Sequence, residues 1–318
     1  MLGRCALGAP NDCVSNARRL MLRSLTARLL VTWLLAAWLL AGLATPAKAD
    51  DTSDPRLLPT SEQYAREEAR KAIPWTQLTP ANQRRVRHTV RNASVYRRLP
   101  TCVVPCNPQV FDFLIRRPEV VTSVWNLMGI SQLTIDRESD SVFRAVDQLG
   151  AKGRTDVVYS QHDEEARGVT VAVIDGLYQQ KPMPRPLNAQ CVLLLRSGST
   201  VESNGQTYIT ARVDAFVKFE RVTADLVARG LQPLLVQTAD HNFQETMKFI
   251  STFSRTAERD PSGMRHLAER LTSIDDPTRS ELVEVCSLAS EQAAARAAAR
   301  AAEQVRLAQL RAGDLETK

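Results

Sequence analysis

The pattern of apolar and polar positions changes period along this chain of 318 residues. Between Pro108 and Leu127 apolar side chains recur every three or four residues, which is typical of amphipathic helices. Pro118 interrupts this run, so the pattern predicts two short helices rather than one. After Gly129 the period becomes two. Six strands are predicted there, over residues 131–137, 141–149, 154–161, 168–179, 189–196 and 207–221.

Short turns connect the predicted strands, and no helical segment separates them. Short connections favour an antiparallel meander, because parallel strands need crossovers of a dozen or more residues. In the last strand Ile209, Val213 and Val217 share one face, and Arg212 and Asp214 share the other. That alternation predicts a strand with one buried face.

A long helical region follows the predicted sheet. Residues 234–257 carry Phe243, Met247 and Ile250 on one face. A helix of this length, at about 1.5 Å per residue, can cross the whole face of a curled sheet. Residues 94–104 form a candidate first strand before the helix pair. The sequence therefore predicts an α+β fold, in which a curled antiparallel sheet of six to seven strands packs on a long C-terminal helix, with extra N- and C-terminal helices.

The N-terminal segment indicates a secretory leader. Arg23 and Arg28 precede an apolar run over residues 29–40, and Ala47 and Ala49 are the small residues that a signal peptidase recognises. The apolar run is shorter than the roughly 20 residues that span a bilayer, so a cleaved leader is favoured over a permanent anchor. We predict a signal peptide over residues 1–49, with Met21 as an alternative start, and a periplasmic or secreted mature protein.

The composition divides the rest of the chain into four parts. Residues 50–80 are rich in Asp, Pro, Ser and Thr and form a predicted linker or arm. Residues 81–260 form the globular α+β domain, and residues 261–290 form short helices. Residues 291–318 are rich in Ala and Arg and predict an exposed helical tail.

Removal of the leader would change the charge of the protein. The full chain has 41 Lys and Arg residues against 35 Asp and Glu residues, a net charge of +6. The leader holds six of the basic residues and one of the acidic ones, which leaves 35 against 34. This balance removes the main electrostatic support for nucleic-acid binding.

One basic segment remains in the mature chain. Its arginines are Arg84, Arg85, Arg87, Arg91, Arg97 and Arg98. A cluster of this kind can meet the anionic head groups of a membrane surface, and its alternative role is a solvated helix face.

Established catalytic motifs are absent from the sequence: it contains no nucleophile elbow, Walker loop, dinucleotide-binding glycine motif or zinc-protease motif. His162 precedes the acidic residues 163–165 at a predicted turn, where a solvated loop is favoured over a metal cluster. His241 follows Asp240 in a helical region, where adjacent residues do not face each other. We therefore assign no catalytic residue, metal or cofactor.

Four cysteines lie beyond the leader: Cys102, Cys106, Cys191 and Cys286. Cys102 and Cys106 enclose three residues, and a turn there would allow a local disulfide, which persists in exported proteins. Free buried thiols are the second interpretation, and a metal or redox pair is the third. Pro105 and the lack of a second pair with ligand spacing count against the third.

The order of a helix pair, several antiparallel strands and one long C-terminal helix resembles the helix-grip fold of the START-like superfamily, which includes lipid-transfer domains and polyketide cyclase-like proteins. The resemblance covers residues 95–257 and rests on element order. It implies a cavity between sheet and helix that takes an apolar ligand, and the alternative is a dry core. Periodicity places there Val171, Val173, Leu193, Leu195, Val213, Val217, Phe243, Met247 and Ile250.

The sequence thus favours an exported periplasmic or envelope protein that binds a hydrophobic small molecule or lipid without chemistry. The alternative is an envelope structural or interaction protein that docks partners through residues 84–98 and the Ala/Arg-rich tail. A cyclase or hydrolase that uses His162 or His241 is the least favoured function, and no nucleic-acid partner is expected.

We expect export with cleavage after Ala49, so that the mature chain begins at Asp50. The intact mass of the exported protein tests this, and a chain that keeps residues 21–49 would contradict it. Ala49→Phe should block processing, because the peptidase accepts only small side chains at this position.

Overall fold

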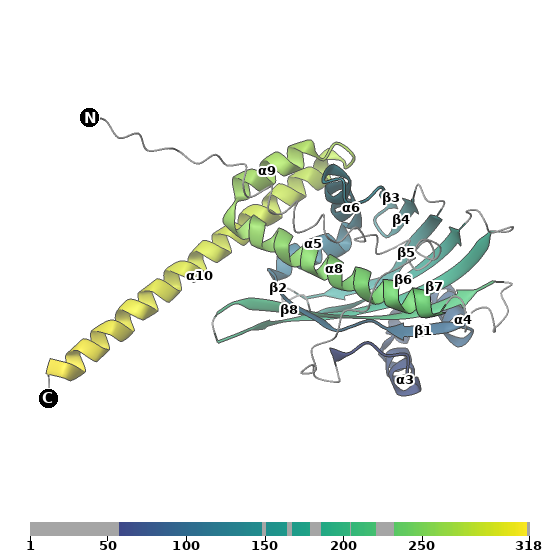
Figure 1. The fold of residues 1–318 in the computed structure, drawn as a ribbon, viewed down its shortest axis with the longest axis horizontal. Coiled ribbons are helices and arrows are strands. Elements are labelled where there is room, and N and C mark those ends of the chain that lie inside the picture. The colour runs from purple at the N-terminus through teal and green to yellow at the C-terminus, as the bar shows by residue number, and fades with distance from the viewer. Residues whose placement is uncertain are drawn as a thin grey trace.

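A curled antiparallel sheet forms the centre of the computed structural model, which describes residues 57–147, 151–163, 167–178, 186–203, 205–220 and 232–316 (Figure 1). The predicted leader lies outside these residues. In the described parts of the chain eight strands pair in the order β1-β8-β7-β6-β5-β4-β3, and β2 also pairs with β8. The strands are β1 (Val95–Arg98), β2 (Cys102–Pro105), β3 (Thr134–Ser139), β4 (Val142–Val146), β5 (Ala151–His162), β6 (Gly168–Tyr178), β7 (Leu187–Val201) and β8 (Thr207–Phe219).

The predicted meander is confirmed, because each strand from β3 to β8 pairs with its neighbour in sequence, antiparallel throughout. The predicted first strand is instead two strands, β1 and β2, which pair with different parts of β8. They are separated by residues 99–101, where Pro100 has no backbone N–H to donate to a ladder.

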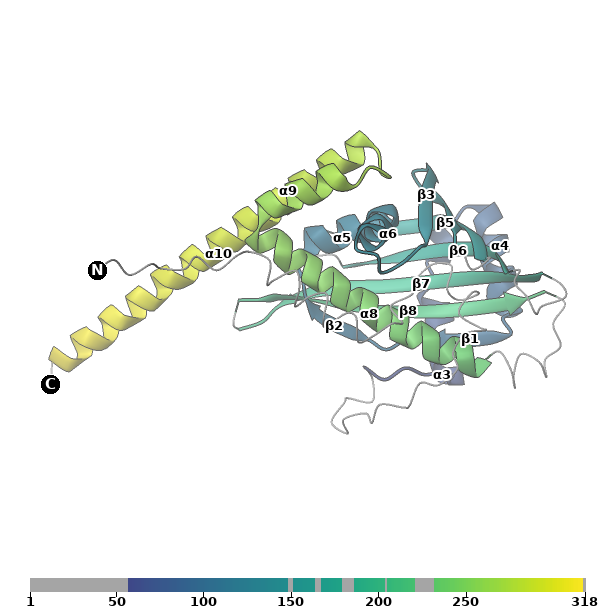
Figure 2. The same ribbon diagram turned by 45° about the horizontal axis from the view of Figure 1, so that its top comes forward.

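Three helices cover the concave face of the sheet (Figure 2). These are α5 (Pro108–Arg116), α6 (Pro118–Leu127) and the long α8 (Gln232–Arg259). The side chain of Asn107 caps α5 by accepting hydrogen bonds from the backbone N–H groups of Gln109 and Val110, at 2.9 and 3.3 Å. Pro118 begins α6, so the prediction of two helices is confirmed.

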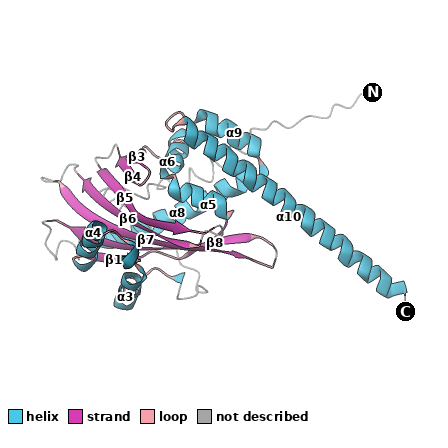
Figure 3. Ribbon diagram, turned by 180° about the vertical axis from the view of Figure 1, so that it is seen from behind, coloured by secondary structure: helices cyan, strands magenta, loops and turns pink. Residues whose placement is uncertain are grey.

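The convex face of the sheet is covered as well, by α3 (Gln63–Ala72), the short helix η2 (Trp75–Gln77) and α4 (Pro80–Arg91) (Figure 3). Ala65 and Ala69 of α3 and Val86 and Val90 of α4 are buried in one apolar cluster with Leu194 and its neighbours in the sheet. Part of the segment predicted as an arm therefore packs on the domain. The prediction that β8 has only one buried face is wrong, because α3 and α4 cover the other.

Two helices end the described chain, α9 (Pro261–Arg270) and α10 (Asp276–Glu316). The first part of α10 packs on α8, α9 and α5, and the rest extends away from the body (Figure 1). The residues predicted as separate short helices and a tail thus share one continuous helix beyond Asp276. No helix in the described ranges is long and apolar enough to cross a membrane.

A fully buried carboxylate links the sheet to α3. Asp214 of β8 accepts hydrogen bonds from the Tyr96 hydroxyl at 2.7 Å, from Arg98 Nε at 2.8 Å and from Arg196 Nη2 at 2.9 Å. Arg98 also pairs with Glu68 of α3 at 2.8 Å. A buried charge is tolerated only when it is paired in this way, so these contacts fix how α3 sits on the sheet.

We expect Asp214→Ala to lower the free energy of unfolding by about 3–5 kcal/mol, because it leaves the buried Arg98 guanidinium without its main partner. Glu138→Ala is the matched control. It removes a carboxylate that pairs with the exposed Arg144 and Arg154, and it should leave the thermal midpoint nearly unchanged. Equal shifts of the midpoint would contradict this account.

Candidate ligand-binding cavity

A cavity of about 210 Å³ lies between the concave face of the sheet and α8. Strands β3 to β8 form its floor, α8 lies across it, and α5 and α6 close one side. Its wall is almost entirely apolar. The side chains that line it include Leu114, Ile115, Val121, Trp125, Ile135, Phe143, Val157, Ala172, Ile174, Leu193, Leu195, Val213, Ala215, Ala239, Phe243, Met247 and Ile250.

The structure brings together six of the nine residues that periodicity placed in a cavity: Leu193, Leu195, Val213, Phe243, Met247 and Ile250. They come from β7, β8 and α8, and in each of these elements they share the face that is turned toward the cavity. Val217 is buried on the same face of β8, two residues beyond the lining residue Ala215.

Val171 and Val173 lie on the opposite face of the sheet, in the cluster under α3 and α4, so their predicted position is wrong. Their neighbours Ala172 and Ile174 line the cavity instead. The physical reason is that β6 is apolar on both faces, because helices cover both. The alternation of side chains then shows which residues share a face, but it does not indicate which of the two faces is turned toward α8.

The sequence prediction missed the polar positions of the wall. Thr155, Thr170, Asn242 and Thr246 all line the cavity. Thr155 is 7% exposed, and its hydroxyl has no hydrogen-bond partner within the described residues. The alternation of the strand could have identified Thr155. It lies two positions before Val157 in a predicted strand, so both side chains are on the same face of the sheet.

Neither histidine that the sequence suggested for catalysis is among the residues that line the cavity. The His162 side chain is buried at the end of β5, with Nδ1 3.7 Å from a carboxylate oxygen of Asp112. Burial lowers the pKa of His162, which keeps the imidazole neutral at neutral pH. The adjacent Glu164 and Glu165 lie outside the described residues. Among those that are described, no cluster of His, Cys, Asp and Glu could hold a metal ion.

The basic segment does not form one surface. Arg85 pairs with Asp156 at 2.6 Å, Arg97 pairs with Asp240 of α8, and Arg98 is buried against Asp214. Burial raises the pKa of Asp240, and the bond from Arg97 offsets this in part. Arg84, Arg87 and Arg91 are exposed on α4. Three of the six arginines thus form ion pairs within the domain, and a role of the segment at a membrane surface stays a prediction.

The candidate disulfide between Cys102 and Cys106 is not formed, because both thiols are free and buried. Cys102 begins β2, and Cys106 follows the last residue of that strand. Four residues of extended strand separate the two Cα atoms by about 13 Å, whereas a disulfide needs about 4.4–6.8 Å. The prediction of a turn was wrong, because residues 102–105 pair with β8.

The architecture is the helix-grip arrangement, a curled antiparallel sheet that holds a long C-terminal helix. No family model and no curated protein matches the chain. Among solved structures the chain is similar to Ara h 8.0201, with 14% identity, a TM-score of 0.31 and coverage of 51% of this chain and 99% of the other. It is also similar to a conserved protein from Geobacillus kaustophilus, with 11% identity, a TM-score of 0.28 and coverage of 47% and 93%.

We expect Cys102, Cys106 and Cys286 to resist alkylation in the folded protein at pH 8. Burial raises the pKa of Cys102 to about 11 and those of Cys106 and Cys286 to about 12, so the reactive thiolate is scarce as well as shielded. Peptide mass mapping after alkylation, with and without denaturant and without reductant, measures this. A disulfide-linked peptide that holds Cys102 and Cys106 would contradict it.

Proposed function

We propose that this is an exported envelope protein of the START-like superfamily, which binds a hydrophobic ligand of the lipid class in the cavity between the sheet and α8. The observation that carries the proposal is the apolar lining of that cavity, to which separate segments of the chain contribute. Burial of apolar surface would supply the affinity, at about 0.8 kcal/mol for each methylene group removed from water.

The size of the cavity narrows the class of ligand. A volume of about 210 Å³ is below the roughly 300 Å³ at which typical small-molecule pockets begin. It exceeds the roughly 150 Å³ of an apolar cavity that holds a single benzene ring. A ligand of slender cross-section suits this space, such as one acyl chain or a small ring system.

The polar positions in the wall support a ligand over a dry core. A buried hydroxyl with no partner costs about 1–3 kcal/mol, and the Thr155 hydroxyl is in that situation within the described residues. A ligand with one polar atom near Thr155 would remove this cost. The apolar remainder of the ligand would then lie against Met247 and Ile250 of α8.

Export is the second part of the proposal, and it is supported by the leader pattern of residues 1–49. The first described residue is Leu57, so cleavage after Ala49 would remove no part of the fold described above.

A second candidate function is an envelope interaction protein without a ligand. The observation that favours it is the part of α10 that extends from the body without covering any other element (Figure 1). Native mass spectrometry of protein purified from its own envelope separates the two. Co-purified lipid would support the first function, and a stoichiometric protein partner without lipid would support the second.

A matched pair of substitutions tests the cavity directly. Leu193 lines it, whereas the next residue, Leu194, is fully buried on the opposite face of the sheet. We expect Leu193→Ala to weaken the binding of a fluorescent fatty-acid probe about tenfold, or about 1.4 kcal/mol. Leu194→Ala should lower the free energy of unfolding by about 2–5 kcal/mol and leave the dissociation constant of the probe unchanged.

Probe titration and thermal unfolding of both variants measure these effects. If the two variants changed the dissociation constant equally, the cavity would not be the binding site. An absence of saturable binding to the parent protein across several lipid classes would remove the proposal.

A further inference from the structure

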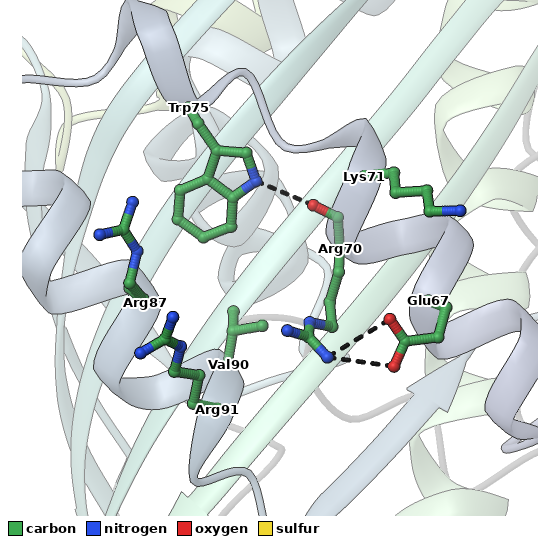
Figure 4. Close-up of a pocket in the computed structure, with 7 residues that line it drawn as sticks. All are labelled: Glu67, Arg70, Lys71, Trp75, Arg87, Val90 and Arg91. Atoms are coloured by element: carbon green, nitrogen blue, oxygen red, sulfur yellow. Dashed lines mark hydrogen bonds and ion pairs between the residues drawn. The ribbon is translucent and has the colours of Figure 1, made fainter.

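A second pocket lies on the other side of the sheet from the cavity, in the groove between α3 and α4 (Figure 4). Its volume is about 420 Å³, and it is separated from the cavity by the sheet itself. Four cationic side chains line the groove: Arg70, Lys71, Arg87 and Arg91. Trp75 provides most of its accessible apolar surface, because Val90 is only 2% exposed, and Glu67 is its one acidic residue.

The charges of this groove are unbalanced. Glu67 pairs with Arg70 at 3.0 Å, which occupies that carboxylate. Arg87 and Arg91 are one turn apart on α4, where like charges repel, and both are exposed. In the described part of the chain neither has a carboxylate partner. An anion placed between them would relieve the repulsion and would gain two charge-assisted hydrogen-bonding partners.

The aromatic wall of the groove is held in place before any ligand binds. The indole N–H of Trp75 donates to the carbonyl oxygen of Arg70 at 2.9 Å, and the Gln83 amide donates to the carbonyl oxygen of Trp75 at 2.7 Å. The Arg87 guanidinium lies 5.5 Å from the centre of the indole ring. Figure 4 shows Arg87 and Arg91 on the same side of the groove, with Val90 between them and Arg70. Because Arg87 lies over the indole ring, an apolar group would contact the part of Trp75 that Arg87 leaves exposed, while an attached anion meets the arginines.

We propose that this groove binds an organic phosphate, that is, a phosphate group attached to a carbon skeleton. A phosphomonoester carries a charge of about −1.5 to −2 at pH 7, which suits the two unpaired guanidinium groups, and arginine matches phosphate oxygens through paired N–H donors. The skeleton packs on the exposed part of Trp75. A soluble metabolite and the head group of an anionic lipid both offer this chemistry. The site is independent of the cavity and of the function proposed for it.

Calorimetric titration of the full chain with phenyl phosphate tests the soluble form of the ligand, and flotation with phosphatidylcholine vesicles, with and without phosphatidic acid, tests the lipid form. The double variant Arg87→Gln/Arg91→Gln removes both unpaired guanidinium groups. Arg84→Gln is the matched control, because Arg84 is exposed on the same helix and does not line the groove.

We expect saturable binding in at least one of the two arms, weakened at least about tenfold by the double variant and less than about twofold by Arg84→Gln. Binding of phenyl phosphate identifies a soluble ligand, and binding only to vesicles with phosphatidic acid identifies a lipid head group. No binding in either arm would overturn the proposal. Equal weakening by Arg84→Gln would also overturn it, because general electrostatics would then explain the result. Inorganic phosphate is titrated in the same way and should bind more weakly than phenyl phosphate; equal affinities would overturn the assignment of an organic phosphate.

Discussion

The buried carboxylate of Asp214 is the constraint on which the architecture depends. Arg98 lies directly opposite it in the register of β1 and β8, and Arg196 reaches it from β7. Three strands are thereby aligned by one charge that water cannot reach. Glu68 accepts from both arginines and so couples α3 to the same group. Because an unpaired buried charge is so costly, a register shift of any of these strands would be strongly disfavoured.

Helices cover both faces of the sheet, and the two faces have different chemistry. The concave face meets α8 through apolar side chains and leaves the cavity, with only a few threonines and Asn242 as polar contacts. The convex face combines an apolar cluster with the ion pairs around Asp214 and the cationic groove beside Trp75. The sheet thus isolates an apolar site from a charged one, and each site can be changed by mutation without touching the other.

The sequence was sufficient for the helix pair, the meander from β3 to β8 and the long helix α8, because periodicity is a local property of the chain. It was insufficient wherever a distant segment decides the outcome. The position of Val171 and Val173 depends on α3, which packs through the small residues Ala65 and Ala69, and on α4, which contributes only Val86 and Val90, so both helices leave little apolar signal of their own. The thiols of Cys102 and Cys106 are kept apart by pairing with β8, about a hundred residues later. The cationic groove joins two helices that the sequence assigned to an arm and to a basic segment.

The continuous helix α10 has a mechanical consequence. Arg296 still pairs with Glu258 of α8 at 3.1 Å, and the helix continues from there to Glu316, which corresponds to about 30 Å at 1.5 Å per residue. Alanine and arginine favour the helical state, so this segment acts as a stiff spacer rather than a flexible tether. Anything held at its far end would stand off from the domain by up to that length, and would rotate with it as one rigid unit.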